Sequence, residues 1–204
     1  MNDRFFEQKK EKQDRIINAA FKIFSNVSYK HGSTDDIVAE AEISKGLLFH
    51  YFVSKEGLYT FLYDYSVRFI SMELSTVVSV KETDYFELKR QIEMAHYNVM
   101  KNYPYLLTFV DRASVEADSK IKKEIEDKKN SLNQLYDDIM KRADARHLKN
   151  TLELDRIIKL TEYTVSGISK AHFRKAKPSP KLLYQEKVEY LDQLKTICNQ
   201  EIED

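Results

Sequence analysis

Apolar residues recur at helical spacing along most of the chain, beginning close to its start. The first set falls at intervals of three and four residues, the pattern of one buried helix face: Ile16, Ala19, Ala20, Ile23, Phe24 and Val27. Residues 9–15 form a polar lead-in to this face. We expect the helix to end between Tyr29 and Gly32, where Gly32 can supply the left-handed residue that often ends a helix.

Three shorter helical units follow, each preceded by a residue suited to cap a helix. Ser33 and Thr34 can cap the first unit, and Ser44 can cap a second that runs to Phe52. Ser54 can cap a third, whose apolar positions continue far along the chain. Two short capped helices joined by a brief turn, with a longer helix behind them, are typical of a helix-turn-helix.

The remaining sequence keeps its helical periodicity in five further segments, at residues 84–102, 104–115, 119–144, 152–173 and 181–202. The last of them is predicted to face inward through Tyr184, Val188, Leu191, Leu194, Ile197 and Cys198. The clearest break lies at Lys177–Pro180, and only 4 glycines and 3 prolines in 204 residues favour long helices over a turn-rich β fold. We predict an all-α chain of about nine helices, with a helix-turn-helix domain at residues 1–56 and a helical ligand-binding and dimerisation domain at 57–204.

Charge and composition narrow the class of protein only partly. The formal net charge is zero, and residues 1–58 carry nine basic and nine acidic side chains, so charge alone does not argue for DNA binding. A single cysteine, Cys198, excludes an intramolecular disulfide framework and a cysteine-rich metal site. The first ten residues are too polar for a signal peptide, and no apolar run approaches the roughly 18 residues that span a membrane, so we expect a cytoplasmic protein.

The short motifs that would indicate an enzyme are missing from the sequence. It contains no G-x-G-x-x-G, P-loop, HExxH or G-x-S-x-G pattern. Its five histidines are scattered without the spacing of metal ligands: His31, His50, His96, His147 and His172. We therefore expect no catalysis, no metal and no other cofactor.

The start of the second short helix has the properties of a phosphate-binding site. Ser44 and Lys45 lie at its N-terminus, where backbone amides and a cation both favour an anion. Gly46 follows without a side chain, so this helix end can approach a phosphate or a base edge closely. Thr34 occupies the equivalent place on the preceding helix, where its alternative role is a cap, and the two roles can coexist.

This stretch also resembles the TetR family of transcriptional regulators. The resemblance is carried by the runs Ile43–Phe52 and Val53–Leu58, preceded by similar residues at 16–24, 32–34 and 36–41. It covers about residues 10–62, and the rest of the chain matches the family in being helical and in length. The resemblance implies an all-helical, dimeric regulator that binds double-stranded operator DNA.

The resemblance also implies roles for particular side chains. The second short helix would enter the major groove, where Leu47, Phe49 and His50 would meet base edges and thymine methyls. Tyr51 would be a second polar tip on the groove side and would meet a phosphate. Lys55, at the start of the next helix, would grip the DNA backbone.

Three residues depart from the usual pattern of the family. Glu42 stands in the turn where glycine is frequent, which leaves a left-handed backbone there less certain. Leu47 replaces a frequent polar residue, so apolar contact would replace hydrogen-bond readout at one base. Gly57 replaces a common glutamate and removes the partner that Ser54 would have in a capping box.

The two last helical segments, 152–173 and 181–202, both carry apolar stripes. By resemblance they pair with their copies in a second chain to form a four-helix bundle, and the alternative is packing within one chain. A two-fold dimer would place two recognition helices about 34–36 Å apart, which corresponds to one turn of B-DNA and a near-palindromic operator.

The middle helices are expected to hold a pocket for an inducer. Thirteen tyrosines and eleven phenylalanines supply apolar walls with hydroxyl groups, which suits a small lipophilic or aromatic ligand. The candidates are Tyr63, Tyr97, Met100, Phe109, Arg112, Tyr136 and Tyr163, and each has ordinary core packing as its alternative. Repression relieved by this ligand is the mode that the family implies. A helical adaptor that binds a protein partner is the alternative function, which the zero net charge supports best.

Overall fold

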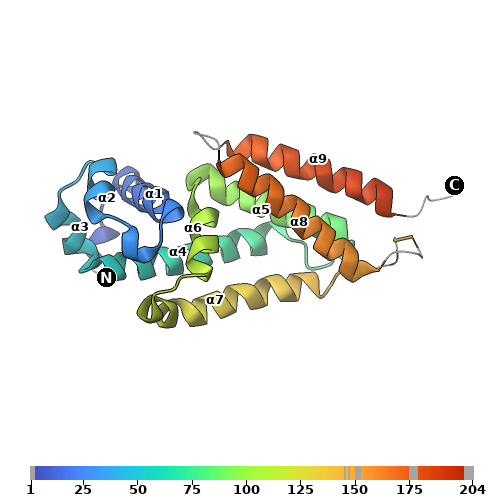
Figure 1. Cartoon of the computed structure of the whole chain (residues 1–204), viewed down its shortest axis with the longest axis horizontal. Coiled ribbons are helices and arrows are strands. Elements are labelled where there is room, and N and C mark those ends of the chain that lie inside the picture. The colour runs from blue at the N-terminus through green and yellow to red at the C-terminus, as the bar shows by residue number, and fades with distance from the viewer. Residues whose placement is uncertain (1–2, 145, 147, 150–152, 175–178, 200–204) are drawn as a thin grey trace. The chain divides into compact units, whose positions relative to one another are not determined.

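The computed structural model describes residues 3–144, 146, 148–149, 153–174 and 179–199. Within them the chain forms two short 3-10 turns, nine α-helices and isolated β-bridges instead of strands (Figure 1). The elements are η1 Asp3–Phe5, α1 Lys10–Asn26, η2 Tyr29–His31, α2 Thr34–Glu40, α3 Lys45–Phe52, α4 Lys55–Val77, α5 Tyr85–Asn102, α6 Leu106–Ser114, α7 Ser119–Met140, α8 Leu154–Phe173 and α9 Pro180–Cys198. The all-α prediction is confirmed.

Some predicted features fall on residues outside the described ranges. These are His147, the start of the segment at 152–173, residues 177–178 of the predicted break and residues 200–202 of the last segment. The described parts of the two last segments correspond to α8 and α9.

The contacts divide the chain into two compact units. The first consists of Met1–Ser71 and Val99–Asn133, and the second of Met72–Asn98 and Gln134–Asp204. The helix-turn-helix therefore packs into one unit with α6 and with parts of α4, α5 and α7. A functional boundary between residues 56 and 57 stays a prediction, because these packing units divide the chain at other positions.

The core of the first unit is built from aromatic rings where α1 packs on α6. The ring of Phe24 lies 4.9 Å from that of Tyr59, which lies 5.0 Å from Phe109. These side chains are buried, and edge-to-face pairs at such distances add to the stabilisation that burial alone provides. The aromatic content noted in the sequence is therefore used here for packing.

Polar contacts also fix the C-terminal end of α1 in the first unit. Arg112 Nε of α6 donates to the Ser25 carbonyl at 2.9 Å, and the Tyr29 amide donates to the Glu116 carboxylate at 2.8 Å. The Ser25 carbonyl and the Tyr29 amide are both backbone groups, so the contacts hold the chain at the helix end itself. A displacement of α6 would therefore pull on α1.

Gly32 does not have the left-handed conformation predicted for it. Its φ is −65°, and α1 has already ended at Asn26. A Cβ at this position would lie 2.3 Å from the Phe24 ring. Glycine is needed here because the loop passes directly over a buried aromatic side chain, and not because of its φ.

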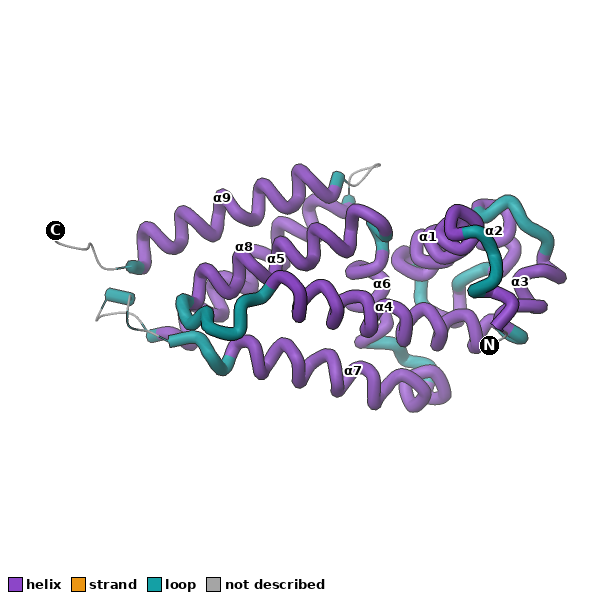
Figure 2. Tube along the Cα trace, turned by 180° about the vertical axis from the view of Figure 1, so that it is seen from behind, coloured by secondary structure: helices purple, strands orange, loops and turns teal. Residues whose placement is uncertain are grey.

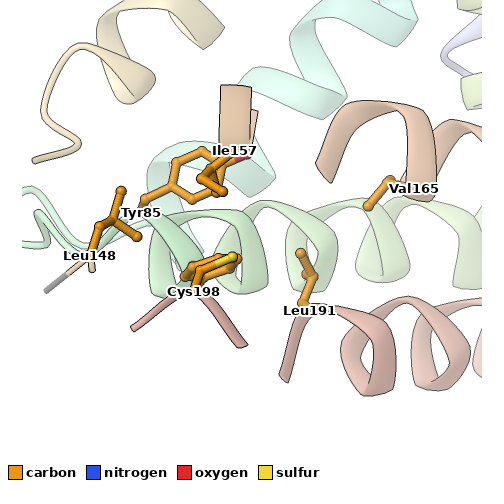
Figure 3. Packing of buried hydrophobic residues seen from close by; sticks show 7 residues of the cluster. Tyr85, Leu148, Ile157, Val165, Leu191 and Cys198 are labelled. Carbon is orange, nitrogen blue, oxygen red and sulfur yellow. The ribbon is translucent and has the colours of Figure 1, made fainter. Parts of the chain in front are cut away.

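The second unit buries an apolar cluster contributed by α5, α8, α9 and the segment before α8. Its members are Tyr85, Phe86, Leu148, Ile157, Val165, Leu191 and Cys198, most of which Figure 3 labels. Helices α8 and α9 pack side by side (Figures 1 and 2). The predicted inward face of α9 holds for Leu191 and Cys198 but is wrong for Ile197, which is 64% exposed.

Candidate nucleic-acid interface

Helices α2 and α3 begin at the caps that the sequence predicts. The Ser33 hydroxyl accepts a hydrogen bond from the Asp36 amide at 3.2 Å, and the Ser44 hydroxyl accepts one from the Leu47 amide at 3.2 Å. Ser33 is the cap of α2, so Thr34 is its first helical residue. Each cap satisfies one backbone donor and leaves others at the helix start to reach a ligand.

The turn between these helices is left-handed although it lacks glycine. Glu42 has φ 53°, its amide donates to the Ala39 carbonyl, and the Ile43 amide donates to the Val38 carbonyl. This pair of bonds is a Schellman motif, which usually has glycine at the left-handed position. The backbone at Glu42 therefore takes the left-handed conformation although the residue there is a glutamate.

Arg15 of α1 supports this turn from the side. Its Nε donates to the Ala41 carbonyl at 2.8 Å, and its Nη1 lies 4.0 Å from the Glu42 carboxylate. The guanidinium thereby binds one of the carbonyl groups left over at the end of α2 and partly offsets the negative charge of Glu42. The turn is held by contacts that the local sequence does not reveal.

Exposure along α3 defines one accessible side. Ser44, Lys45, Gly46 and His50 are exposed, Leu47 and Phe49 are half-buried, and Leu48, Tyr51 and Phe52 are buried. The exposed residues of the N-terminal half lie where a close approach is least hindered, since nothing lies within 4 Å of the place for a Gly46 Cβ. Six of the predicted contact residues on α3 and its cap are therefore accessible together: Ser44, Lys45, Gly46, Leu47, Phe49 and His50.

Lys45 is paired within the domain. Its ammonium lies 2.9 Å from the Asp35 carboxylate of α2, and both side chains are more than half exposed. An exposed pair of this kind contributes little to stability, so a phosphate could compete for the lysine at small cost. The pair places the ammonium between the starts of α2 and α3, where Thr34 also lies.

Tyr51 is not the exposed polar tip that the sequence predicts. Its side chain is 2% exposed, and its ring lies 5.5 Å from that of Phe5 in η1. The ammonium of Lys12 lies 5.8 Å from the same ring. The cause is the segment before α1, whose Phe5 packs against this side of α3.

Lys55 also points to groups of its own domain. Its ammonium donates to the Lys30 and Gly32 carbonyls at 3.1 and 3.0 Å and lies 4.7 Å from the Tyr29 ring. Burial lowers the pKa of this ammonium from its ordinary value. The lysine therefore connects the η2 loop to the start of α4. A contact between Lys55 and a DNA phosphate would have to share or replace these bonds.

The connection from α3 to α4 is strained at one residue. Val53 has φ 66° and ψ −46°, and the Ser54 amide donates to the Phe52 carbonyl at 2.7 Å, which is a γ-turn of the rarer, strained form. Ser54 then caps α4 by accepting from the Gly57 amide at 2.9 Å. A Cβ at residue 57 would lie 2.2 Å from the Phe52 oxygen, so the glutamate common in the family would not fit this turn.

Sequence reasoning missed the contribution of the N-terminal segment to this surface. Phe5 is 0% exposed, and a guanidinium nitrogen of Arg4, Nη1, lies 3.4 Å from Nε2 of His50. The signal in the sequence was the apolar pair Phe5–Phe6 inside an otherwise polar stretch.

The predicted pocket residues are divided between the two units. Tyr63, Met100 and Phe109 are buried in the first unit, and Arg112 of that unit binds the end of α1 as described above. In the second unit Tyr136 is hydrogen-bonded to His96 at 2.7 Å.

The two other candidates of the second unit are Tyr97 and Tyr163. Tyr97 stacks on Tyr184 with 5.1 Å between ring centres. Tyr163 is 75% exposed on α8, so a pocket role for it stays a prediction. A shallow pocket of about 440 Å³ lies in the first unit beside Arg15, Lys22 and Lys101, and none of the seven candidates lines it.

The described ranges contain neither a metal-binding cluster nor a helix suited to cross a membrane. There, no group of three or more His, Cys, Asp or Glu side chains is arranged to hold a metal ion. No described helix is both long and apolar enough to cross a membrane.

Comparison with known sequences associates the helix-turn-helix with one family. Residues 16–60 match the family model described as bacterial regulatory proteins, tetR family. A curated relative is the uncharacterized HTH-type transcriptional regulator YuxN of Bacillus subtilis strain 168, which is 26% identical over 97 residues. That alignment covers 48% of this chain and 33% of the relative, so the chain matches about a third of the relative's length.

Solved structures share the fold over nearly the whole chain. A TetR family regulator from Chloroflexus aurantiacus superposes with a TM-score of 0.61 at 16% identity, covering 98% of this chain and 99% of its own. PfmR, a TetR family regulator from Thermus thermophilus, gives 0.59 at 20% identity, with coverage of 89% and 97%. A TetR-like regulator from a Rhodococcus species gives 0.57 at 15% identity, with coverage of 93% and 96%.

Proposed function

We propose that this chain is a DNA-binding transcriptional regulator of the TetR family that reads a near-palindromic operator, because residues 16–60 match the model of that family and solved TetR family regulators share its fold. One observation carries the proposal: the capped start of α3 presents Ser44, Lys45, Gly46 and His50 together on one accessible side. Backbone amides at such a helix start bind phosphate, and side chains there reach base edges in the major groove.

A protein of zero net charge can bind DNA when only a few side chains, gathered in one place, contact the duplex. Lys45 is held near the start of α3 by a weak exposed pair, so DNA can recruit it without a large loss of stability. The half-buried side chains of Leu47 and Phe49 would supply apolar contact with thymine methyls. The comparisons name transcriptional regulators, so the protein-adaptor alternative is not favoured.

The direct test is selection of duplexes from a random DNA pool, followed by affinity measurements at several salt concentrations. We expect a near-palindromic consensus and an affinity that falls steeply with salt, as phosphate contacts require. His50→Ala should weaken binding to the selected duplex while helicity stays unchanged. A protein that selects no sequence and binds duplex DNA no more tightly than its His50→Ala variant would contradict the proposal.

We further propose that the regulator is a homodimer held through α8 and α9. Both helices leave large apolar side chains exposed although they pack well against their own unit: Leu160, Tyr163, Leu182, Tyr190 and Ile197. Apolar groups gathered on two adjacent helices are typical of a surface that a partner covers. A second copy of this chain suits it because operator symmetry requires two recognition helices.

For regulation, we propose repression relieved by a small lipophilic or aromatic ligand. Ligand binding would shift the population toward a state in which α3 no longer fits the groove. The contacts of α6 with α1 would transmit the change, since Arg112 holds the end of α1. Thermal shift of the purified protein with a library of apolar compounds, followed by DNA release with each hit, tests this proposal.

A further inference from the structure

The segment before α1 is fixed on the side of the recognition helix. Phe5 is buried among the rings of Tyr51, Phe52 and Phe61, with 4.9 to 5.6 Å between ring centres. Rings in edge-to-face and tilted arrangements at these distances attract one another beyond the effect of burial. Phe5 therefore anchors the segment on the core shared by α3 and α4.

Hydrogen bonds hold the same segment from the side of α1. The Gln13 amide group donates to the Phe6 and Gln8 carbonyls at 3.1 and 2.7 Å. The side chain of Gln8 in turn donates to the Arg4 carbonyl at 3.2 Å. The backbone of Arg4 is thus positioned from two sides, so less conformational freedom is lost when its side chain binds a partner.

The Arg4 side chain extends the exposed side of α3. Its Nη1 lies 3.4 Å from Nε2 of His50, and both residues are exposed. A guanidinium has donors and no acceptor, so in this contact Nε2 accepts and the imidazole proton resides on Nδ1. With Nε2 accepting from Arg4, Nδ1 is left as a donor, which suits the N7 or O6 acceptor of a base in the major groove.

We propose that Arg4 is a DNA-contacting residue that binds a backbone phosphate beside the base contacted by His50. The inference rests on the proposed function, because it takes α3 as the recognition helix. A guanidinium binds phosphate through parallel hydrogen bonds, and a position next to α3 brings it within the same groove edge. In this role Arg4 fixes the protein on the duplex and holds His50 in its donor tautomer.

The experiment compares Arg4→Ala with Arg68→Ala on a duplex that the wild-type protein selects from a random pool. Arg68 is a matched control, since it is an exposed arginine on α4, about 20 Å along the helix from Lys55 and paired with Asp64. Arg4→Ala should bind about tenfold more weakly. The slope of log affinity against log salt should also fall by about 0.9 per protomer bound. Arg68→Ala should match the wild-type protein in both measurements.

The remaining outcomes separate this inference from the proposed function. Arg4→Lys should keep most of the salt slope, because the charge remains. A wild-type protein that selects and binds a duplex, with Arg4→Ala and Arg68→Ala equal in affinity and slope, would overturn the role of Arg4 alone. Loss of affinity in Arg4→Ala with an unchanged salt slope would also overturn it, because no phosphate contact would have been removed. Failure of the wild-type protein to select any duplex would instead contradict the proposed function.

Discussion

Gly46 separates the requirements of the fold from those of DNA binding. It lies in the first turn of α3, with no heavy atom within 4 Å of the place for a Cβ. Alanine is a better helix residue than glycine by about 0.5–1 kcal/mol. We therefore expect Gly46→Ala to raise the free energy of unfolding slightly in urea titrations. The same variant should lose about tenfold or more in affinity for its operator, because the added methyl group meets the DNA. Equal affinity of the variant and the wild-type protein would show that α3 does not approach DNA at this residue.

At Gly57, in contrast to Gly46, the fold itself leaves no room for a side chain. A Cβ there would lie 2.2 Å from the Phe52 carbonyl oxygen, a rigid backbone group that also accepts from Ser54 in the turn at Val53. We expect Gly57→Ala to lower the free energy of unfolding by about 1–3 kcal/mol, because the turn must shift to admit the methyl group. Urea unfolding of this variant beside Gly46→Ala gives the comparison, since both exchange glycine for alanine near a helix start. A Gly57→Ala protein as stable as the wild type would mean that the turn is more pliable than its geometry indicates.

Among the helices, α5 and α9 are joined by a buried ion pair. Lys187 Nζ lies 2.8 Å from the Glu93 carboxylate, and both side chains are almost fully buried. The same carboxylate is 3.5 Å from Nδ1 of His96, whose Nε2 is hydrogen-bonded to Tyr136 of α7. Removing one partner leaves a buried charge uncompensated, which typically costs about 3–5 kcal/mol. We expect that loss for Glu93→Gln in urea unfolding at neutral pH, whereas Glu153→Gln, in an exposed pair with Arg156, should change stability by less than about 1 kcal/mol.

The pH dependence of the same pair has a definite sign. Burial by itself would raise the pKa of the Glu93 carboxyl, but Lys187 and His96 outweigh it and hold this pKa well below its ordinary value of 4.5. A carboxyl whose pKa is lower in the folded state than in the unfolded state stabilises the fold fully at pH values above its unfolded-state pKa. This stabilisation is lost as the pH falls from the unfolded-state pKa toward the folded-state pKa. The difference in free energy of unfolding between the wild type and Glu93→Gln should therefore shrink as the pH is lowered from 6 through about 4. A difference that stays constant over that range would argue against a charged Glu93.

The helices themselves were predictable because their signals are local. Periodic apolar positions and the caps Ser33, Ser44 and Ser54 lie within a few residues of the structure they determine, and all three caps are present. The features that were missed are mostly contacts between residues distant in sequence. Arg4 meets His50 across 46 positions and Lys187 meets Glu93 across 94, and no local pattern encodes such pairs. The exposure of Tyr51 was predicted wrongly for the same reason, since the ring that covers it belongs to Phe5.

On the scale of the whole molecule, the proposed function requires two copies of the chain. One recognition helix reads only a few base pairs, and two helices about 34–36 Å apart read a palindrome with the combined affinity of both. In the proposed dimer, the exposed apolar side chains of α8 and α9 would form the pairing surface. Dimerisation would bury these apolar groups, and each Å² of apolar surface removed from water stabilises the dimer by about 25 cal/mol.

Charge placed on that surface should separate the copies without unfolding them. Ile197 on α9 is 64% exposed in the single chain, so Ile197→Glu leaves the core of the second unit intact but puts a carboxylate into a dry interface. We expect a wild-type dimer in sedimentation velocity and a monomer for Ile197→Glu, with the same helicity and a loss of operator binding. Val80→Glu is the control, because Val80 is 82% exposed in the same unit but outside α8 and α9, and this variant should remain dimeric. If Ile197→Glu stays dimeric while Val80→Glu dissociates, the pairing surface lies on the other side of the unit and the operator geometry must be derived from that face.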